Sequence, residues 1–432
     1  MTPNQLIETV LRVAKKIIPR SVFKKVQPFY HETLAFISAV IFRFPSRDIR
    51  VVAVTGTKGK TSVTEFINSI FEEAGYKTAV LNTIRFKVDT EERRNKFKMS
   101  TPGRGFVQRF LRKAVAKDCD WVIMEITSQA VLQARHKYIE LDALVFTNIS
   151  PEHIEAHGSF ANYLDAKLEI ARALRASSKE KRVIVANTDD EHGQDFINTA
   201  GTKSVEVKIG NAEPYELKDT GSSFTFRGVE IKTHFPGLFN IYNMLTAAEF
   251  ACFHEISLGS IQRALEGQKD IRGRLELVNP DDSFEVYVDY AHTPDSLEKV
   301  YQAFPERRKV CILGNTGGGR DTWKRPVMAR IAEKYCDSII LANEDPYDED
   351  PQKIVDEMYE AIENKEKARI ILDRREAIHT ALKEAREGDV VLITGKGTDP
   401  YIMEAEGKKT PWDDASVVRE EMEKIKKTSE EV

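Results

Sequence analysis

The stretch VVAVTGTKGKTSVTEFINSIFEEAG, residues 51–75, decides the fold. Its first five residues form an apolar run that predicts a buried strand, and a glycine turn follows at 56–62. Residues 63–74 then place their apolar side chains on one stripe, which predicts a helix that ends at Gly75. This order is typical of a phosphate-binding turn, because backbone N–H groups and the positive end of the helix both face the phosphate.

The turn supplies candidate ligands for ATP and Mg²⁺. We expect Lys60 to reach the terminal phosphates and Thr61 to hold Mg²⁺. Val54 stands where the common P-loop pattern has its first glycine. Glu125 follows the apolar run 121–124, where the metal-side acid of such a nucleotide site belongs. The predicted nucleotide-binding residues of the turn are Gly56, Thr57, Lys58, Gly59, Lys60, Thr61 and Ser62.

Apolar runs alternate with amphipathic stretches through the rest of the chain, which predicts an α/β fold with parallel sheets. Residues 203–235 instead alternate in short segments, which predicts a small antiparallel patch. We expect a short helical segment at 1–49, a P-loop-type ATPase domain at 50–272 and a C-terminal Rossmann-like α/β domain at 273–432. The predicted strands are 51–55, 121–124, 143–147, 183–186, 286–289, 310–313, 339–342, 370–373 and 390–394.

Lys167 lies in the apolar stripe of a predicted helix at 160–174. An inward ammonium is costly unless it is paired, and burial readily lowers its pKa. The alternative is a lysine whose stem packs while its head reaches an acid at the surface. The stripe consists of Phe160, Tyr163, Leu164, Leu168, Ala171 and Leu174.

Two histidines and two acids follow the predicted strand 143–147, in the stretch SPEHIEAHG at 150–158. His153 and His157 are four residues apart and are candidate ligands of a divalent ion. A zinc site is not expected, because the sequence shows no third ligand.

Composition predicts a soluble, cytoplasmic protein. Apolar residues make up 41% of the chain, no run approaches the length of a membrane span, and no signal-peptide pattern is present. The four cysteines are scattered, so we expect them to be reduced core residues. Residues 1–50 hold nine Lys/Arg and three Asp/Glu, so the net −4 of the chain divides into +6 there and −10 elsewhere. This basic segment either packs on the next domain or contacts anionic lipid.

Several ordered motifs resemble those of the Mur ligases, most closely the UDP-N-acetylmuramoyl-tripeptide synthetase (MurE) type. The similarity runs from about residue 51 to 401. The motifs are TGTKGKT at 55–61, STP at 100–102, EITSQA at 125–130, FTNIS at 146–150, AK at 166–167, FNIYN at 239–243, GRLE at 273–276, DYAHTPD at 289–295 and GKG at 395–397.

The resemblance implies roles for particular residues. Lys167 is expected to carry a carbamate made from CO₂ and, with Glu125, His153 and Thr61, to hold Mg²⁺. The implied catalytic residues are Lys60, Glu125, His153 and Lys167. Further nucleotide-binding residues are implied to be Asn240, Asn243, Arg274, Asp289, His292, Lys324 and Arg325. The implied substrate-binding residues are Ser100, Thr101, Pro102, Ser128, Arg135, Asp345, Tyr347, Gly395 and Asp399.

The sequence departs from the family pattern at four places. About fifty residues precede the ATPase domain where these ligases usually carry a uridine-binding domain, so a lipid-linked carrier is an alternative to UDP. The family's Asp-Asn-Pro-Arg motif is EDPY here, at 344–347, and its Gly-Lys-Gly-His-Glu motif is GKGTD at 395–399. Tyr347 offers no guanidinium and Asp399 is a shorter acid, which disfavours diaminopimelate. Gln129 replaces a usual histidine.

We therefore expect an ATP-dependent ligase that joins an amino acid to a muramoyl-peptide-like carboxylate through an acyl phosphate. Small-molecule substrates, ATP and Mg²⁺ are the expected partners, nucleic acid is not expected, and the chain is expected to be a monomer. Two alternatives stay open at this point. One is a folylpolyglutamate synthetase-like ligase, and the other is a non-catalytic nucleotide-binding regulator.

Overall fold

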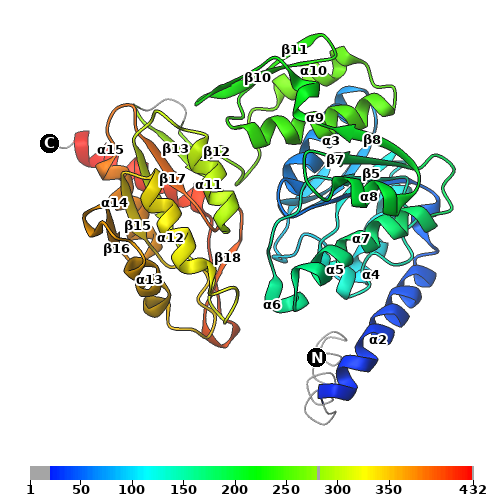
Figure 1. The fold of residues 1–432 in the computed structure, drawn as a ribbon, viewed down its shortest axis with the longest axis horizontal. Helices are drawn as coiled ribbons and strands as arrows, with labels where there is room; N and C mark the ends of the chain where they lie inside the picture. The colour runs from blue at the N-terminus through cyan, green and yellow to red at the C-terminus, as the bar shows by residue number, and fades with distance from the viewer. Residues whose placement is uncertain (1–19, 280–282, 431–432) are drawn as a thin grey trace.

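The computed structural model describes residues 20–279 and 283–430, with side chains from 27 to 428 within those ranges. Figure 1 shows two bodies side by side, each built on its own sheet, with helix α2 (Arg20–Ile41) projecting from the first. The predicted helical lead-in is thus present as α2, and residues 1–19 lie outside the described residues. None of the described helices is both long and apolar enough to cross a membrane.

The first body contains an eight-stranded sheet with β1 near its centre. Strands β2, β5, β1, β6, β7 and β8 run parallel, while β3 and β4 add an antiparallel edge. Strand order is β4-β3-β2-β5-β1-β6-β7-β8. The strands are β1 (Arg50–Thr55), β2 (Thr78–Leu81), β3 (Arg85–Val88), β4 (Glu91–Arg94), β5 (Trp121–Glu125), β6 (Ala143–Phe146), β7 (Val183–Asn187) and β8 (Lys203–Val207).

Helices cover both faces of this sheet. Val52 and Val54 of β1 pack in one core with α3, α9 and α10, and Val51 and Ala53 pack in another with α4, α7 and α8. This two-sided burial is why β1 reads as a continuous apolar run. The helical elements are η1 (Pro45–Arg47), α3 (Lys60–Glu73), α4 (Arg104–Ala116), α5 (Ser128–Leu132), α6 (Ile154–His157), α7 (Phe160–Ala176), α8 (Gly193–Ala200), η2 (Ile209–Ala212), α9 (Leu238–Phe253) and α10 (Leu258–Gly267).

The predicted antiparallel patch is a three-stranded sheet of β9 (Tyr215–Lys218), β10 (Gly221–Phe226) and β11 (Val229–Thr233). The prediction was wrong for 203–207, because β8 joins the large sheet parallel to β7. Strands β3 and β4 were not predicted. Their sequence RFKV and EERR is too charged to show an apolar run.

The second body contains a six-stranded sheet, parallel except for β12, with helices on both faces. It confirms the predicted Rossmann-like α/β architecture. Strand order is β12-β13-β17-β14-β15-β16. The elements are β12 (Glu276–Leu277), β13 (Glu285–Val288), α11 (Pro294–Gln302), β14 (Lys309–Leu313), α12 (Lys324–Tyr335), β15 (Ser338–Leu341), α13 (Pro351–Glu360), η3 (Lys365–Lys367), β16 (Ala368–Ile370), α14 (Arg374–Glu384), β17 (Val390–Ile393), β18 (Tyr401–Met403), η4 (Ala405–Gly407), β19 (Lys409–Pro411) and α15 (Asp414–Glu430).

Two cysteines of this body form a disulfide, contrary to the prediction that all four are reduced. Cys311 lies on β14 and Cys336 directly follows α12, and their Cα atoms are 6.2 Å apart. They are 25 residues apart in sequence, so only the strand–helix packing brings them together. Cys119 and Cys252 are free thiols.

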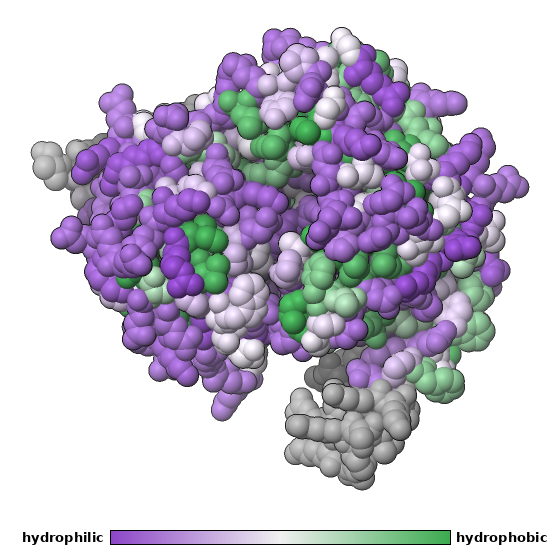
Figure 2. All heavy atoms as spheres, in the orientation of Figure 1, coloured by the Kyte–Doolittle hydropathy of each residue, from purple (hydrophilic) through white to green (hydrophobic). Residues whose placement is uncertain are grey.

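Ionic contacts join the two bodies. From the β4 side of the first body, Arg94 pairs with Asp413 at 2.7 Å, and Lys98 pairs with Asp345 at 2.6 Å and Asp399 at 2.8 Å. Figure 2 shows a mainly hydrophilic surface with hydrophobic patches on either side of the boundary between the bodies. The sequence motifs at 345–347 and 395–399 therefore face the first body.

Gly273 lies in the connection between α10 and β12, and its backbone conformation predicts a sensitive position. Its φ is +62°, and a Cβ there would lie 2.7 Å from the backbone nitrogen of Thr398. We expect Gly273→Ala to lower the free energy of unfolding by about 1–3 kcal/mol, from left-handed strain and this contact. Urea denaturation measures it. Gly267→Ala is the matched control, because a Cβ there meets nothing within 4 Å. Equal stability of the two variants would contradict the assigned conformation.

Candidate active site

The glycine turn after β1 is packed too closely for larger residues. Gly56 and Gly59 have φ values of +149° and +82°. A Cβ at Gly56 would lie 2.0 Å from Thr147 Oγ1, and one at Gly59 would lie 2.3 Å from Asn243 Oδ1. The turn is thus pressed between the end of β6 and the start of α9, with α3 beginning at Lys60. This backbone and helix terminus have the form of a phosphate cradle.

Lys60 points back into the turn. Its Nζ donates to the carbonyl oxygens of Gly56 at 2.9 Å and Thr57 at 2.8 Å. Burial lowers the pKa of Lys60, against the attraction of Glu125. Ser62 is buried in the first turn of α3. The ammonium therefore lies where terminal phosphate oxygens of a nucleotide would take over its hydrogen bonds, and the residues fit ATP.

Thr61 and Glu125 meet as predicted. Thr61 Oγ1 donates to Glu125 Oε1 at 2.7 Å, and Glu125 is fully buried at the end of β5. Glu125 also accepts from the backbone N–H of Thr83 at 3.0 Å. Arg274, from the second body, reaches Thr61 Oγ1 at 3.2 Å. A hydroxyl and a carboxylate are oxygen ligands of the kind that Mg²⁺ prefers, so this pair fits the metal.

Lys167 is buried beside the same turn. It is 2% exposed, and its Nζ donates to the carbonyl oxygen of Gly56 at 2.6 Å. The ammonium also lies 5.0 Å from the centre of the Tyr163 ring. Burial, and then the charge of Lys60, hold the pKa of Lys167 well below its usual value. Among the described residues, no carboxylate lies within salt-bridge distance of Lys167, so the surface-reaching alternative does not describe this lysine.

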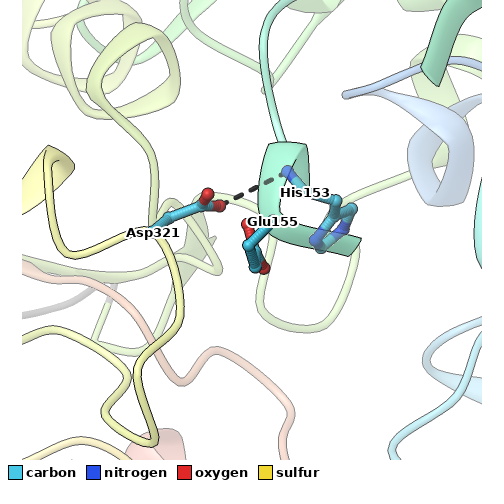
Figure 3. A group of neighbouring side chains, drawn as sticks. All are labelled: His153, Glu155 and Asp321. Carbon is cyan, nitrogen blue, oxygen red and sulfur yellow. Dashed lines mark hydrogen bonds between the residues drawn. The ribbon is translucent and has the colours of Figure 1, made fainter. Parts of the chain in front are cut away.

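His153 lies on the other side of Tyr163, with the two ring centres 6.5 Å apart. Its backbone N–H donates to Asp321 Oδ2 at 3.3 Å, and potential ligand atoms of His153, Glu155 and Asp321 lie within 4.8 Å of one another. Figure 3 shows Asp321 reaching from the second body toward the segment that carries the other two residues. Burial lowers the pKa of His153 to about 4, so its imidazole is neutral and available to a metal. The acids beside His153 are thus Glu155 and Asp321, while His157, the other histidine expected to bind a divalent ion, is outside this group and lies 3.1 Å from Ser128 Oγ.

Glu152 connects the turn with the second body. Lys58 Nζ donates to Glu152 Oε1 at 3.0 Å, and His292 Nε2 lies 3.1 Å from the same oxygen. Burial alone would raise the pKa of Glu152, but the Lys58 charge and the His292 hydrogen bond hold it well below its usual value. Sequence analysis named Lys58 and His292 but not the carboxylate that joins them.

The other predicted nucleotide residues fall into two groups. Asn240 and Asn243 lie at the start of α9 beside Gly59, and the Arg274 guanidinium lies 4.7 Å over the Tyr290 ring. The Asp289 carboxylate accepts hydrogen bonds from the backbone N–H groups of Leu275 and Ala291, so its partners are backbone groups.

Lys324 and Arg325 begin α12, and both are buried. Lys324 is close enough to Glu155 and Asp321 to influence their pKa values. Arg325 instead pairs with Glu349 and Glu357, each at 2.8 Å, so the structure gives its guanidinium partners other than a nucleotide.

The predicted acceptor residues Ser100 and Thr101 lie next to Glu125, and Arg135 contacts Thr101. Ser100 Oγ lies 2.6 Å from Thr83 Oγ1, and Thr101 Oγ1 donates to the carbonyl oxygen of Glu125 at 2.7 Å. Arg135 donates to the carbonyl oxygen of Thr101. Ser128 Oγ lies 3.1 Å from His157 Nε2. The loop Ser100–Thr101–Pro102 is therefore a neighbour of Glu125, and the start of α5 lies beside His157.

The predicted amino-acid residues gather around a lysine that sequence analysis missed. Lys98 Nζ lies between Asp345 and Asp399, and buried Lys396 also pairs with Asp345 at 2.7 Å. Burial would lower the pKa of Lys98, but the two carboxylates raise it. A Cβ at Gly395 would lie 2.5 Å from Glu344 Oε2, so this glycine lets the loop approach β15.

A second missed residue is Arg320, whose guanidinium lies 4.6 Å over the Tyr347 ring. It thus brings a positive charge to the place where the family motif has its arginine. Lys98 lies two residues before the Ser100 motif and Arg320 follows three glycines, which are signals that sequence reading could have used.

Comparisons with known proteins agree with this geometry. Residues 54–251 match the Mur ligase middle domain, and residues 273–397 match the Mur ligase glutamate ligase domain. A relative from Syntrophomonas wolfei, named UDP-N-acetylmuramoyl-L-alanyl-D-glutamate–2,6-diaminopimelate ligase, is 37% identical over 87% of this chain and 78% of its own.

Solved structures show the same fold. One with the same ligase name superposes with a TM-score of 0.59 at 25% identity, over 87% of this chain and 78% of its own. Mycobacterium tuberculosis folylpolyglutamate synthase, solved with ADP and AMPPCP, gives 0.66 at 16% identity over 85% and 93%, which shows a shared fold alone. From the matched domains and the sequence relative, the chain belongs to the Mur ligase family, as an ATP-dependent ligase that adds an amino acid in peptidoglycan precursor synthesis.

Proposed function

We propose that this ligase uses ATP and Mg²⁺ to join an amino acid to the carboxylate of a muramoyl-peptide-like acceptor through an acyl phosphate. The observation that carries the proposal is the convergence of the Lys60 turn, the Thr61–Glu125 pair and buried Lys167 on one place. Their spacing fits a triphosphate with its metal. The acceptor carboxylate would enter beside Ser100, Ser128 and Arg135.

The residues act mainly by placing positive charge beside the reacting phosphate groups. When bound, Mg²⁺ draws negative charge from the phosphate oxygens while the γ-phosphoryl group of ATP passes to the acceptor carboxylate. Lys60 turns from its own loop carbonyls to the phosphates and stabilises the charge that develops in transfer. Arg274 approaches from the second body. The amine of the amino acid then attacks the acyl phosphate carbon and phosphate leaves.

We propose that Lys167 works as a carbamate. Its lowered pKa favours the neutral amine, and only a neutral amine attacks CO₂. A bond forms between Lys167 Nζ and the carbon of CO₂, and the nitrogen loses one proton. The product is a carbamate anion, at a position where the buried amine otherwise has no carboxylate partner. With His153, this anion would hold a second Mg²⁺ near the acceptor and the γ-phosphate.

We propose two domains, 50–272 and 273–432, that close over the nucleotide about the connection at Gly273. The supporting contacts are Lys58–Glu152–His292, Arg274–Thr61 and the approach of Asp321 to His153. Closure would exclude water from the acyl phosphate. Location in the cytoplasm, a monomeric state and contact of residues 1–49 with anionic lipid are part of the same proposal.

For the incoming amino acid, we propose that Asp345 and Asp399 receive a cationic side chain in place of the Lys98 ammonium. Two carboxylates attract an ammonium group and repel a carboxylate. A basic amino acid such as lysine is therefore the first candidate. Diaminopimelate, named in the relative's activity, is the second, and Arg320 over Tyr347 favours it by offering a guanidinium to a distal carboxylate.

Phosphate release from ATP tests this assignment, measured with UDP-linked and truncated muropeptide acceptors across a panel of amino acids. We expect lysine to exceed diaminopimelate by at least about tenfold in kcat/KM, which corresponds to one unfavourable charge contact. Asp399→Asn should narrow that ratio, and Arg320→Ala should weaken only diaminopimelate. Equal turnover with both amino acids would refute the roles given to Tyr347 and Asp399. Stimulation by folate alone would favour the folylpolyglutamate alternative.

A further inference from the structure

Helix α2 carries an exposed apolar face although it belongs to neither body's core. Figure 1 shows it projecting from the first body. Phe29 is 74% exposed and Ile41 is 66% exposed, and Phe36, Ile37 and Val40 lie between them with nearly half of their surface free. The opposite face packs toward α4 through buried Ala35 and Ala39. α2 is therefore amphipathic, and most of its apolar side is exposed, although the Phe36 ring packs edge-on against Tyr138 with the ring centres 5.3 Å apart.

The exposed residues form one continuous stripe. Positions 29, 33, 36 and 40 follow the spacing of one helical face. Thr33 is the polar member of this set, and its hydroxyl donates to the carbonyl oxygen of Phe29 at 2.9 Å. Its hydrogen-bonding need is thus met within the helix. An apolar environment can cover the stripe without leaving a polar group unsatisfied.

The charge of the N-terminal segment distinguishes between two possible partners of the exposed face of α2, a second copy of the chain and a lipid surface. Residues 1–50 carry a net +6 and the rest of the chain −10. Arg43 and Arg47 are exposed just beyond the apolar stripe. A second copy would bring two positive segments together, whereas an anionic lipid surface offers opposite charge and a medium for the apolar side chains. An apolar face beside basic residues is the pattern of helices that lie in the membrane interface.

α2 is also connected to the acceptor residues. Arg104 Nη2 lies 2.7 Å from His31 Nδ1 of α2 and donates to the carbonyl oxygen of Gln133 at 3.0 Å. Arg135 donates to Gln133 Oε1 at 2.6 Å, and also to the loop at Thr101. The side of the molecule that carries α2 is therefore the side that carries the acceptor residues.

We propose that α2 docks this ligase on an anionic bilayer, with Phe29, Val40 and Ile41 at headgroup depth. Binding is peripheral and reversible. Docking holds the acceptor side of the enzyme close to the lipid surface, and this second part rests on the proposed function. A membrane-anchored muropeptide would then meet Ser128 and Arg135 without leaving the surface.

Co-sedimentation of the full chain with vesicles tests the docking. We expect binding to phosphatidylcholine vesicles that contain phosphatidylglycerol, little binding to pure phosphatidylcholine, and weaker binding as salt rises. The double variant F29S/I41S should bind at least about tenfold more weakly, because two apolar anchors are lost. Y215S/L217S, which removes two exposed apolar side chains on β9, should bind like the parent.

Three outcomes would contradict the proposal. Equal binding to both vesicle types would show that anionic lipid does not attract the protein. An equal loss of vesicle binding in Y215S/L217S would show nonspecific adsorption. A parent that is dimeric by light scattering, and monomeric as F29S/I41S, would assign the face to a second copy. F29S/I41S should keep the parent's thermal midpoint and its ligation rate without vesicles. Absence of ligation with every acceptor would refute the proposed function, yet vesicle binding would still decide the docking.

Discussion

Lys60→Met is expected to lower ATP-dependent ligation by about 10³-fold or more, the loss seen when a charge-stabilising donor is removed from a transition state. The reason is that Lys60 is the ammonium inside the glycine turn, with both hydrogen bonds made to the turn itself at 2.9 and 2.8 Å. Methionine keeps the length of the stem and removes the charge. Phosphate release and product formation, measured together, check the result.

The variant should remain folded, so the loss cannot come from unfolding. Burial lowers the pKa of Lys60, so its charge is costly in the folded state without a phosphate. We expect the thermal midpoint to fall by no more than about 3 °C, equivalent to about 1 kcal/mol. Lys232→Met, at an exposed position on β11, is the control and should retain full activity. Ligation by Lys60→Met at the parent's rate would show that the triphosphate binds elsewhere.

Lys167→Ala should also abolish ligation, and short carboxylic acids such as acetate or formate should restore part of it. The added acid would occupy the space left by the side chain and supply the anion that the carbamate otherwise provides. The amine lies 2.6 Å from the carbonyl oxygen of Gly56, so the cavity opens directly onto the nucleotide turn. Ligation rates with and without added acid, in the parent and the variant, measure the rescue.

Two further readouts separate a carbamate from a merely structural lysine. The parent should lose activity in CO₂-depleted buffer and regain it when bicarbonate is added, and ¹³C-labelled CO₂ should give a carbamate signal that Lys167→Ala lacks. Full activity of Lys167→Ala without any rescue agent would remove the carbamate from the mechanism. Activity that no acid restores, together with no labelled signal in the parent, would make Lys167 a packing residue.

Replacing Lys167 should lower activity but leave the free energy of unfolding at neutral pH unchanged or higher. Burial lowers the pKa of Lys167 in the folded protein below its pKa in the unfolded chain. At any pH below the unfolded pKa, folding must therefore either release a proton from this amine or bury its charge. This loss of folding free energy is present at neutral pH and disappears as the pH rises past the pKa of the lysine in the unfolded chain. Lys167→Met should therefore be at least as stable as the parent at pH 7, as urea denaturation would show.

Much of the fold was predictable because local periodicity reports burial. The run 51–55 became the central strand β1, and the stripe of 160–174 became α7 with Lys167 buried in it. The Thr61–Glu125 contact also followed, since Glu125 ends β5 and Thr61 begins the helix after β1, the parallel strand next to β5. Strands β3 and β4 were missed because charged residues interrupt their apolar pattern, and β4, at the edge of the sheet, has no buried residue.

The sequence by itself determined the glycine turn after β1, the acid at the end of β5, the inward lysine and the two α/β bodies, because each shows in the pattern of neighbouring residues. Only the tertiary structure decided the Cys311–Cys336 bond, the place of Lys98 between two aspartates and the approach of Asp321 to His153. The last two contacts join residues 247 and 168 positions apart. No local pattern records such a pairing, since it forms only when loops of the two bodies come together.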